Sequence, residues 1–90
     1  AEESDMFVLF QNKPNPFTGN TTINYFVPAS AKSAILQIVN QQGLIISTIQ
    51  LTTGSGNIEI DATQLNSGLL TYSLIVDEKI IATKQMMLTK

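Results

Sequence analysis

The chain has 90 residues, no cysteine, no histidine and a formal net charge of −2. This length suits one small domain, and apolar packing must hold its core because cysteine is absent and can supply neither a disulfide nor a thiolate metal site. Hydrophobic residues make up 43% of the chain, which is typical of a packed domain rather than a disordered segment. Residues 1–5 are polar and acidic and are predicted to be a linker or tag remnant, with the domain spanning residues 6–90.

The distribution of charge argues against several classes of partner. All five cations are lysines scattered along the sequence, whereas a surface that follows nucleic-acid phosphates needs clustered cations. No apolar run approaches the roughly 20 residues that span a bilayer. The first ten residues are acidic where a secretory signal peptide would be basic, so we expect no export leader within this stretch. The absence of cysteine is compatible with an extracytoplasmic location.

The first apolar run, residues 7–10, leads into a proline-rich segment, Q-N-K-P-N-P-F. Pro14 and Pro16 each lack a backbone donor and bias the preceding residue to extended geometry. The segment is therefore predicted to be a rigid extended turn, neither helix nor central strand, with Phe17 packed at the rim of the fold.

Alternating apolar and polar residues predict strands along the rest of the chain. Three of them have a clear apolar face: Ile23, Tyr25 and Val27 in residues 21–27, Ala34, Leu36 and Ile38 in residues 33–39, and Leu70, Tyr72, Leu74 and Val76 in residues 69–76. Further strands are predicted at 44–51, 57–61 and 80–88, with turns at 40–43, 54–56, 66–68 and 77–79, and one helical turn capped by Asp61. About seven short strands at this spacing predict an all-β, antiparallel β-sandwich.

Four segments together resemble one known family. They are Q-N-K-P-N-P-F at 11–17, V-N-Q-Q-G at 39–43, D-A-T-Q-L-N-S-G at 61–68 and T-K-Q-M-M-L-T-K at 83–90. They are similar, in this order, to the motifs of type A C-terminal sorting domains of the type IX secretion system of Bacteroidetes. The chain departs from that pattern at Leu70, where the family usually carries an aromatic residue and where leucine can fill a core position with some repacking.

The resemblance implies an immunoglobulin-like sandwich of about seven strands. It also implies a sorting signal for a cargo protein joined on the N-terminal side, which would pass through the periplasm and end secreted or at the cell surface. The implied partners are the type IX machinery, including an outer-membrane shuttle and a sortase-like protease that removes the domain on or after export. Partner contacts are predicted at Lys84, Met86, Met87, Leu88 and Lys90, and structural motif positions at Pro14, Asn15, Pro16, Phe17, Gly43, Asp61, Leu65 and Gly68.

Residues that carry enzymatic chemistry are scarce. Without histidine or cysteine, the usual nucleophile–base triads and His or Cys metal sites are missing. Glu59 is expected at the surface, and Asp77 and Glu78 are expected to form a hairpin turn rather than a calcium site. We therefore predict no catalytic residue, no metal, no cofactor and no small-molecule substrate.

Two alternatives share the predicted fold, because a β-sandwich hosts many functions. One is a carbohydrate-binding or adhesion module, which would need an aromatic platform, although most aromatic residues here alternate with core positions. The other is a spacer domain of a surface protein. Five apolar residues lie on faces expected to be polar: Ile35, Val39, Ile45, Leu69 and Ile75. They are either a docking surface for a partner or ordinary scattered surface hydrophobes.

Overall fold

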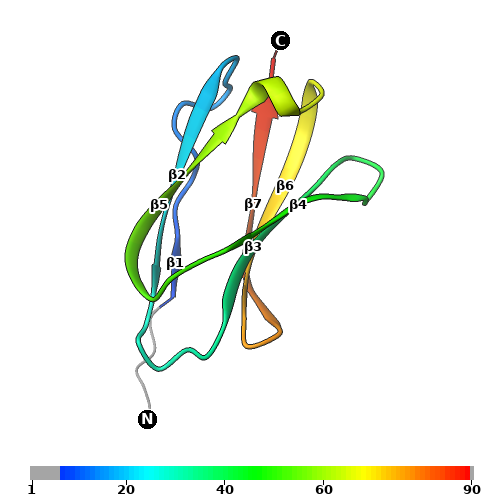
Figure 1. Ribbon diagram of the computed structural model, residues 1–90. Helices are drawn as coiled ribbons and strands as arrows, with labels where there is room; N and C mark the ends of the chain where they lie inside the picture. Colours follow the sequence, from blue (N-terminus) through cyan, green and yellow to red (C-terminus); the bar gives the residue numbers. More distant parts are fainter. Residues whose placement is uncertain (1–6, 90) are drawn as a thin grey trace.

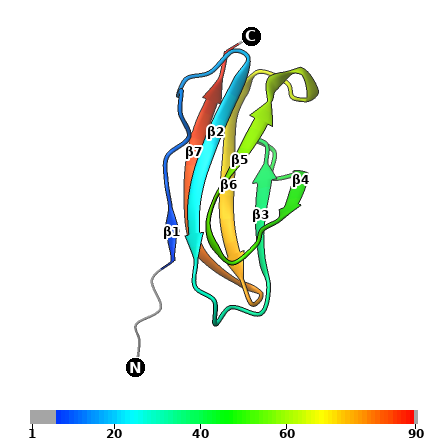
Figure 2. The same ribbon diagram turned by 60° about the vertical axis from the view of Figure 1, so that its left-hand side comes forward.

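The computed structural model describes residues 7–89, which form seven strands and one short 3₁₀ helix. The strands are β1 (Val8–Leu9), β2 (Asn20–Val27), β3 (Ala34–Val39), β4 (Ile45–Gln50), β5 (Gly54–Asp61), β6 (Gly68–Val76) and β7 (Lys79–Leu88), and the helix is η1 (Ala62–Gln64). They build two antiparallel sheets, ordered β1-β2-β5 and β4-β3-β6-β7, which face each other in Figures 1 and 2. The predicted all-β sandwich of seven strands is confirmed.

The position of β4 distinguishes this sandwich from the constant-type immunoglobulin arrangement. In that arrangement the fourth strand lies beside the fifth, whereas here β4 pairs with β3, from Ile35↔Gln50 to Val39↔Ile45. The chain therefore crosses between sheets in the short connection from β4 to β5. Since β4 covers one edge of the larger sheet, the smaller sheet keeps only three strands.

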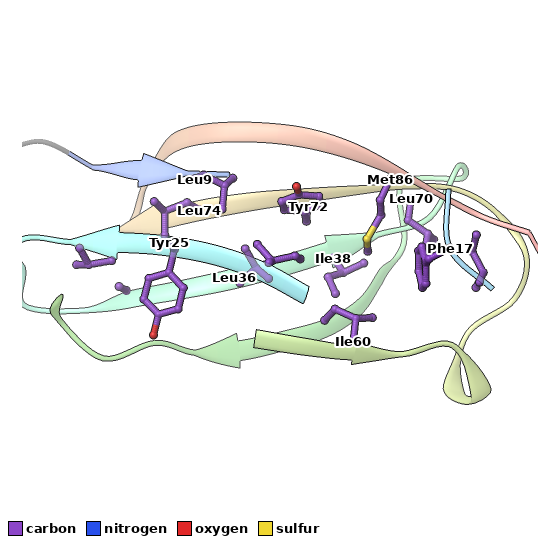
Figure 3. Packing of buried hydrophobic residues seen from close by; sticks show 14 of the residues in the cluster. Leu9, Phe17, Tyr25, Leu36, Ile38, Ile60, Leu70, Tyr72, Leu74 and Met86 are labelled. Carbon is purple, nitrogen blue, oxygen red and sulfur yellow. The ribbon is translucent and has the colours of Figure 1, made fainter. Parts of the chain in front are cut away.

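Period-2 alternation decides which face of each strand is buried. Burial alternates strictly along β2, β3 and β6, and the predicted inward faces of all three strands are confirmed. The inward side chains form one apolar cluster between the sheets, shown in Figure 3. Its fully buried large side chains include Tyr72, Phe17, Ile23, Leu36, Ile38, Leu74, Met86 and Leu88.

The turn predicted at Gly54-Ser55-Gly56 is wrong, because all three residues belong to β5 and pair with β2. Gly56 lies opposite Tyr25, and a Cβ built at Gly56 would lie 2.5 Å from the Tyr25 hydroxyl oxygen. The tyrosine ring thus occupies the space of the missing side chain, a recognised way to cover a glycine in a sheet. Here glycine marks a close approach by a neighbouring ring rather than a change of chain direction.

The hairpin predicted at 77–79 is present between β6 and β7, but it has only two connecting residues, because Lys79 already belongs to β7. Asp77 and Glu78 have φ of 50° and 69°, and positive φ at both central residues is the feature that type I′ hairpins require. The Asp77 carboxylate accepts hydrogen bonds from the backbone N–H groups of Lys32 and Ser33, both at 2.9 Å. Asp77 therefore ties the β2–β3 loop to the hairpin, which accounts for an acidic residue here without a metal.

The tyrosine cover over Gly56 can be tested by adding a methyl group beneath it. Gly56→Ala should lower the unfolding free energy by about 1–3 kcal/mol, because the buried Tyr25 ring must move to admit the new Cβ. Gly19→Ala is the matched control, since nothing lies within 4 Å of a Cβ at that position, and its effect should stay within about 0.5 kcal/mol. Urea unfolding measures both, and equal stabilities of the two variants would contradict the packing described here.

Candidate partner-binding surface

The proline-rich segment lies beside the end of the C-terminal strand. Both prolines follow cis peptide bonds, Lys13–Pro14 and Asn15–Pro16. At the start of the segment, Lys13 exchanges two 2.9 Å backbone hydrogen bonds with Thr22 of β2. The segment is therefore held to the small sheet on one side, which leaves its far end free to meet β7. The segment is neither helix nor central strand, as predicted, and its residues 14–16 form bends rather than an extended run.

At its far end, Phe17 forms a parallel bridge with Leu88. The Phe17 N–H donates to the Met87 carbonyl oxygen, and the Thr89 N–H donates to the Phe17 carbonyl oxygen, each at 2.9 Å. The Phe17 ring is 1% exposed, and Figure 3 places it at the same end of the core as Leu70 and Met86. Phe17 is thus a full member of the core as well as the residue that joins the proline segment to β7.

Side chains of the proline segment extend this contact along the edge of β7. The Asn15 side-chain oxygen accepts a hydrogen bond from the Met87 N–H at 2.9 Å. The Gln11 side-chain N–H donates to the Gln85 carbonyl oxygen at 2.6 Å. Backbone groups of an edge strand are otherwise open to pairing with another chain. The proline segment therefore covers a part of the β7 edge that would otherwise be exposed.

A buried polar network fixes the beginning of the same segment. Asn12 is 1% exposed, and its backbone N–H donates to the Tyr72 hydroxyl oxygen at 2.9 Å. The Tyr72 hydroxyl in turn donates to the Phe10 carbonyl oxygen at 2.8 Å. The Asn12 amide also donates to the Pro14 carbonyl and to Thr21 Oγ1, both at 3.0 Å. These bonds satisfy polar groups that would be costly to bury alone.

Burial raises the pKa of the Tyr72 phenol, and the smaller effect of the hydrogen bond from the Asn12 backbone lowers it. The neutral hydroxyl, which both donates and accepts, is therefore the form that suits this site. The sequence prediction placed Tyr72 in the core but missed its polar role and that of Asn12. A weak signal was present in Thr21, a polar residue that alternates in phase with Ile23 and Tyr25.

The two remaining motif segments adjoin each other at the C-terminal end of the sandwich. Gly43 has a φ of 83° in the β3–β4 turn, where the Asn40 side-chain oxygen accepts from the Gln42 and Leu44 N–H groups. Gly68 has a φ of 134°, and the Gln41 side-chain oxygen lies 3.3 Å from the position of a Cβ there. The 40–42 turn and residues 65–67, 69 and 70 also line a hollow of 270 Å³.

Asp61 caps η1 as predicted, because its carboxylate accepts from the Thr63 N–H and hydroxyl, both at 2.9 Å. The half-buried Leu65 packs against the core and ends this helical turn with a bond from its N–H to the Ala62 carbonyl. The Ala62 N–H bonds the Gly19 carbonyl oxygen at 2.8 Å. The Asp61–Gly68 box is thus joined to the loop that follows Phe17, and Figures 1 and 2 place η1 at the same end of the sandwich as the end of β7.

The residues predicted to contact partners divide into two groups. Met86 and Leu88 are each 1% exposed and pack in the core, so they hold β7 in place. Met87 is 38% exposed on the opposite face of β7, and Lys84 is half-buried. Lys90 lies outside the described residues. In the folded domain, therefore, Met87 and Lys84 are the predicted contact residues within β7 whose side chains a partner can reach.

The outward apolar residues lie on the larger sheet. Ile45 is 59% exposed, whereas Ile35, Val39, Leu69 and Ile75 are half-buried. Ile35 pairs with Ile75, and Ile75 pairs with Ile80, which is 67% exposed. A row of three isoleucines thus crosses β3, β6 and β7 on the outer face of the larger sheet.

The described residues contain neither a cluster of metal-ligand side chains nor a membrane-spanning helix. In the range 7–89, no three His, Cys, Asp or Glu side chains come together in a way that suits a metal ion. Within the same range, no helix has the length and apolar character needed to traverse a bilayer. The motif segments are joined in two pairs: the proline segment contacts the end of β7, and the 40–42 turn adjoins residues 65–70.

Comparison with known protein families matches residues 13–89 to the secretion system C-terminal sorting domain. The chain belongs to this family, that of the type IX secretion system, and is a C-terminal sorting signal. Membership places it in a protein of Bacteroidetes that is exported to the cell surface or secreted. No curated protein and no solved structure matches the chain.

The role of Phe17 in the core predicts a large loss on truncation. Phe17→Ala should lower the unfolding free energy by about 3–5 kcal/mol, because it removes a buried ring and leaves a cavity. Phe10→Ala is the matched control, since that ring is 51% exposed, and it should cost about 1 kcal/mol or less. Denaturant unfolding compares the two, and a loss at Phe17 no larger than that at Phe10 would contradict the assignment.

The Tyr72 hydroxyl should contribute stability that depends on pH. Tyr72→Phe should cost about 1–3 kcal/mol at neutral pH, because it leaves the buried Asn12 N–H without its acceptor. Since folding raises the phenol pKa above its unfolded value near 10, the folded state holds the proton more tightly at alkaline pH. The stability of the unaltered domain should therefore fall as pH rises above about 10, and Tyr72→Phe should lack this part of the fall. Urea unfolding at pH 8 to 11 measures the unfolding free energy of both proteins. If this free energy falls equally with pH in the two, the role assigned to the Tyr72 hydroxyl is refuted.

Proposed function

We propose that this domain directs a cargo protein, attached on its N-terminal side, across the outer membrane, and that the machinery reads the C-terminal end of the folded sandwich. The observation that carries this proposal is the convergence of four motif segments that are far apart in the sequence. The proline segment is bonded to the end of β7, and the 40–43 turn adjoins the box that begins at Asp61. One surface can therefore present all four segments to a single partner.

A folded surface suits recognition because it fixes the distances between its contact groups before binding, which lowers the entropic cost of association. The buried side chains of Met86 and Leu88 hold β7, while Met87 between them faces outward. In this proposal the buried motif residues act as positioning residues, and the exposed residues at the same end make the contacts.

The finer steps follow from the family resemblance. The cargo reaches the periplasm first, and the type IX machinery then moves it outward with the help of an outer-membrane shuttle. A sortase-like protease removes the domain on or after export, and the cargo is then secreted or held at the cell surface. The domain itself performs no catalysis, binds no metal or nucleic acid and converts no small-molecule substrate in this scheme.

Export of a fused reporter tests the proposal. A periplasm-directed reporter that carries residues 1–90 at its C-terminus should appear outside a host with type IX machinery. Deletion of residues 86–90 should abolish export, because it removes Met86 and Leu88 from the core together with the end of the sandwich. Immunoblots of the culture fluid and the cell surface, against a periplasmic fraction, measure the outcome.

Paired lysine variants separate folding from recognition. Lys84→Ala with Lys90→Ala should reduce export of a domain that still folds, because Lys84 is only half-buried and lysine charges open to solvent contribute little to stability. Lys32→Ala with Lys79→Ala is the matched control, since it removes the same charge from exposed positions near the Asp77 hairpin. Equal export by both folded double variants would argue against a role for the basic C-terminal strand. Retention of the unaltered fusion in the periplasm, where a proven sorting domain exports the same reporter, would refute the proposal.

A further inference from the structure

An open hollow of 710 Å³ lies on the outer face of the three-stranded sheet. Side chains of three neighbouring strands point to this face, because Leu9 and Tyr25, the residues between them, are buried in the core. Eight residues line it. Those that alternate outward are Val8, Phe10, Asn24, Phe26, Ser55 and Asn57, and the paired Tyr25 and Gly56 lie between them. It is separate from the end of the sandwich where the motif segments meet.

The aromatic residues are out of phase with the core. Val8 pairs with Phe26, and Phe10 follows on the same side of the β1 segment, with its N–H bonded to the Asn24 carbonyl oxygen at 3.0 Å. Phe10 is 51% exposed and Phe26 is half-buried. Phe10 and Phe26 therefore present their rings on the surface, whereas Phe17, Tyr25 and Tyr72 are buried in the core.

The polar lining is free to bind a ligand. Asn24 and Asn57 are direct partners across the β2–β5 pair, and both are exposed. Within residues 7–89, neither side-chain amide has a hydrogen-bond partner. Ser55 stands opposite Phe26 on the same face. Two adjacent amides and a hydroxyl supply both donors and acceptors at fixed spacing, and the hollow contains no charged side chain.

We propose that this hollow binds a neutral, β-linked pyranose oligosaccharide. Such sugars carry axial C–H groups that form an apolar face, which stacks on the electron-rich face of an aromatic ring. Their equatorial hydroxyl groups lie around the rim of the sugar, where the amides of Asn24 and Asn57 can bond them. An anionic ligand would meet no cation in the lining, so the absence of charge favours a neutral sugar over an acidic one.

Titration of the 90-residue domain with defined oligosaccharides tests the inference. Cellotetraose and chitotetraose are the neutral probes, and a β-(1→4)-linked tetraglucuronate, which keeps the linkage and the equatorial hydroxyl groups of cellotetraose, is the anionic probe. In two-dimensional NMR spectra, at least one neutral probe should shift the signals of Phe10, Asn24, Phe26 and Asn57, and the tetraglucuronate should not. Phe10→Ala should weaken binding at least about 10-fold, because a stacking ring is lost. Asn24→Ala with Asn57→Ala should do the same through lost hydrogen bonds.

Ile80→Ala is the matched control for loss of an exposed hydrophobic side chain, because Ile80 is 67% exposed on the outer face of the other sheet. It should leave the affinity unchanged, and all variants should keep the dispersed spectrum of a folded domain. The inference is overturned if millimolar concentrations of both neutral probes leave the four signals in place. It is also overturned if the anionic probe binds equally well, or if Ile80→Ala weakens binding as much as Phe10→Ala.

Discussion

The pairing of Phe17 with the end of β7 is the constraint on which the C-terminal end of this domain depends. Two backbone hydrogen bonds flank Leu88, and the Phe17 ring enters the core beside them. Without this contact, the outer edge of β7 would expose the backbone of Met87. The loop after Phe17, whose Gly19 carbonyl oxygen accepts the Ala62 N–H, would also no longer be held to β7. The contact joins residues more than 70 positions apart, so the domain needs both ends of its sequence before this end can form.

The sequence predicted correctly those features of the fold that depend on residues close together in the chain. Alternation gave the inward faces of β2, β3 and β6, and glycine and asparagine marked the turn at 40–43, because each depends on neighbours in the chain. The same logic failed at Gly56, whose role depends on the ring of Tyr25 in another strand. It also missed the bond from Asn12 to Tyr72, since no local pattern reveals which buried hydroxyl will meet a given backbone N–H.

Most residues of the family motifs that the structure describes have roles in the fold itself. Phe17, Met86 and Leu88 are buried, Asp61 caps a helix, and Gly43 has a positive φ. A motif of this kind fixes the shape of a surface rather than supplying the atoms on it, because buried residues act on a partner only through what they hold in place. This explains why the motifs identify the class of domain well. The residues that contact a partner are instead to be sought among the exposed neighbours of the motif residues, such as Met87.

The two outward surfaces obey different physical requirements and can therefore coexist. The end of the sandwich that carries the motif segments depends on the contact between Phe17 and β7. The hollow proposed to bind an oligosaccharide depends on the pairing of β2 with β5, in which Asn24 lies opposite Asn57, four residue pairs from the Asn20↔Asp61 pair. Exposed Phe10 adds little to the core, and its ring presents apolar surface to water. A bound sugar would cover that ring while leaving β7 accessible, because the two surfaces share none of their lining residues. The domain can thus be recognised at one end while its small sheet is occupied, and a change at Phe10 should alter sugar binding without altering export.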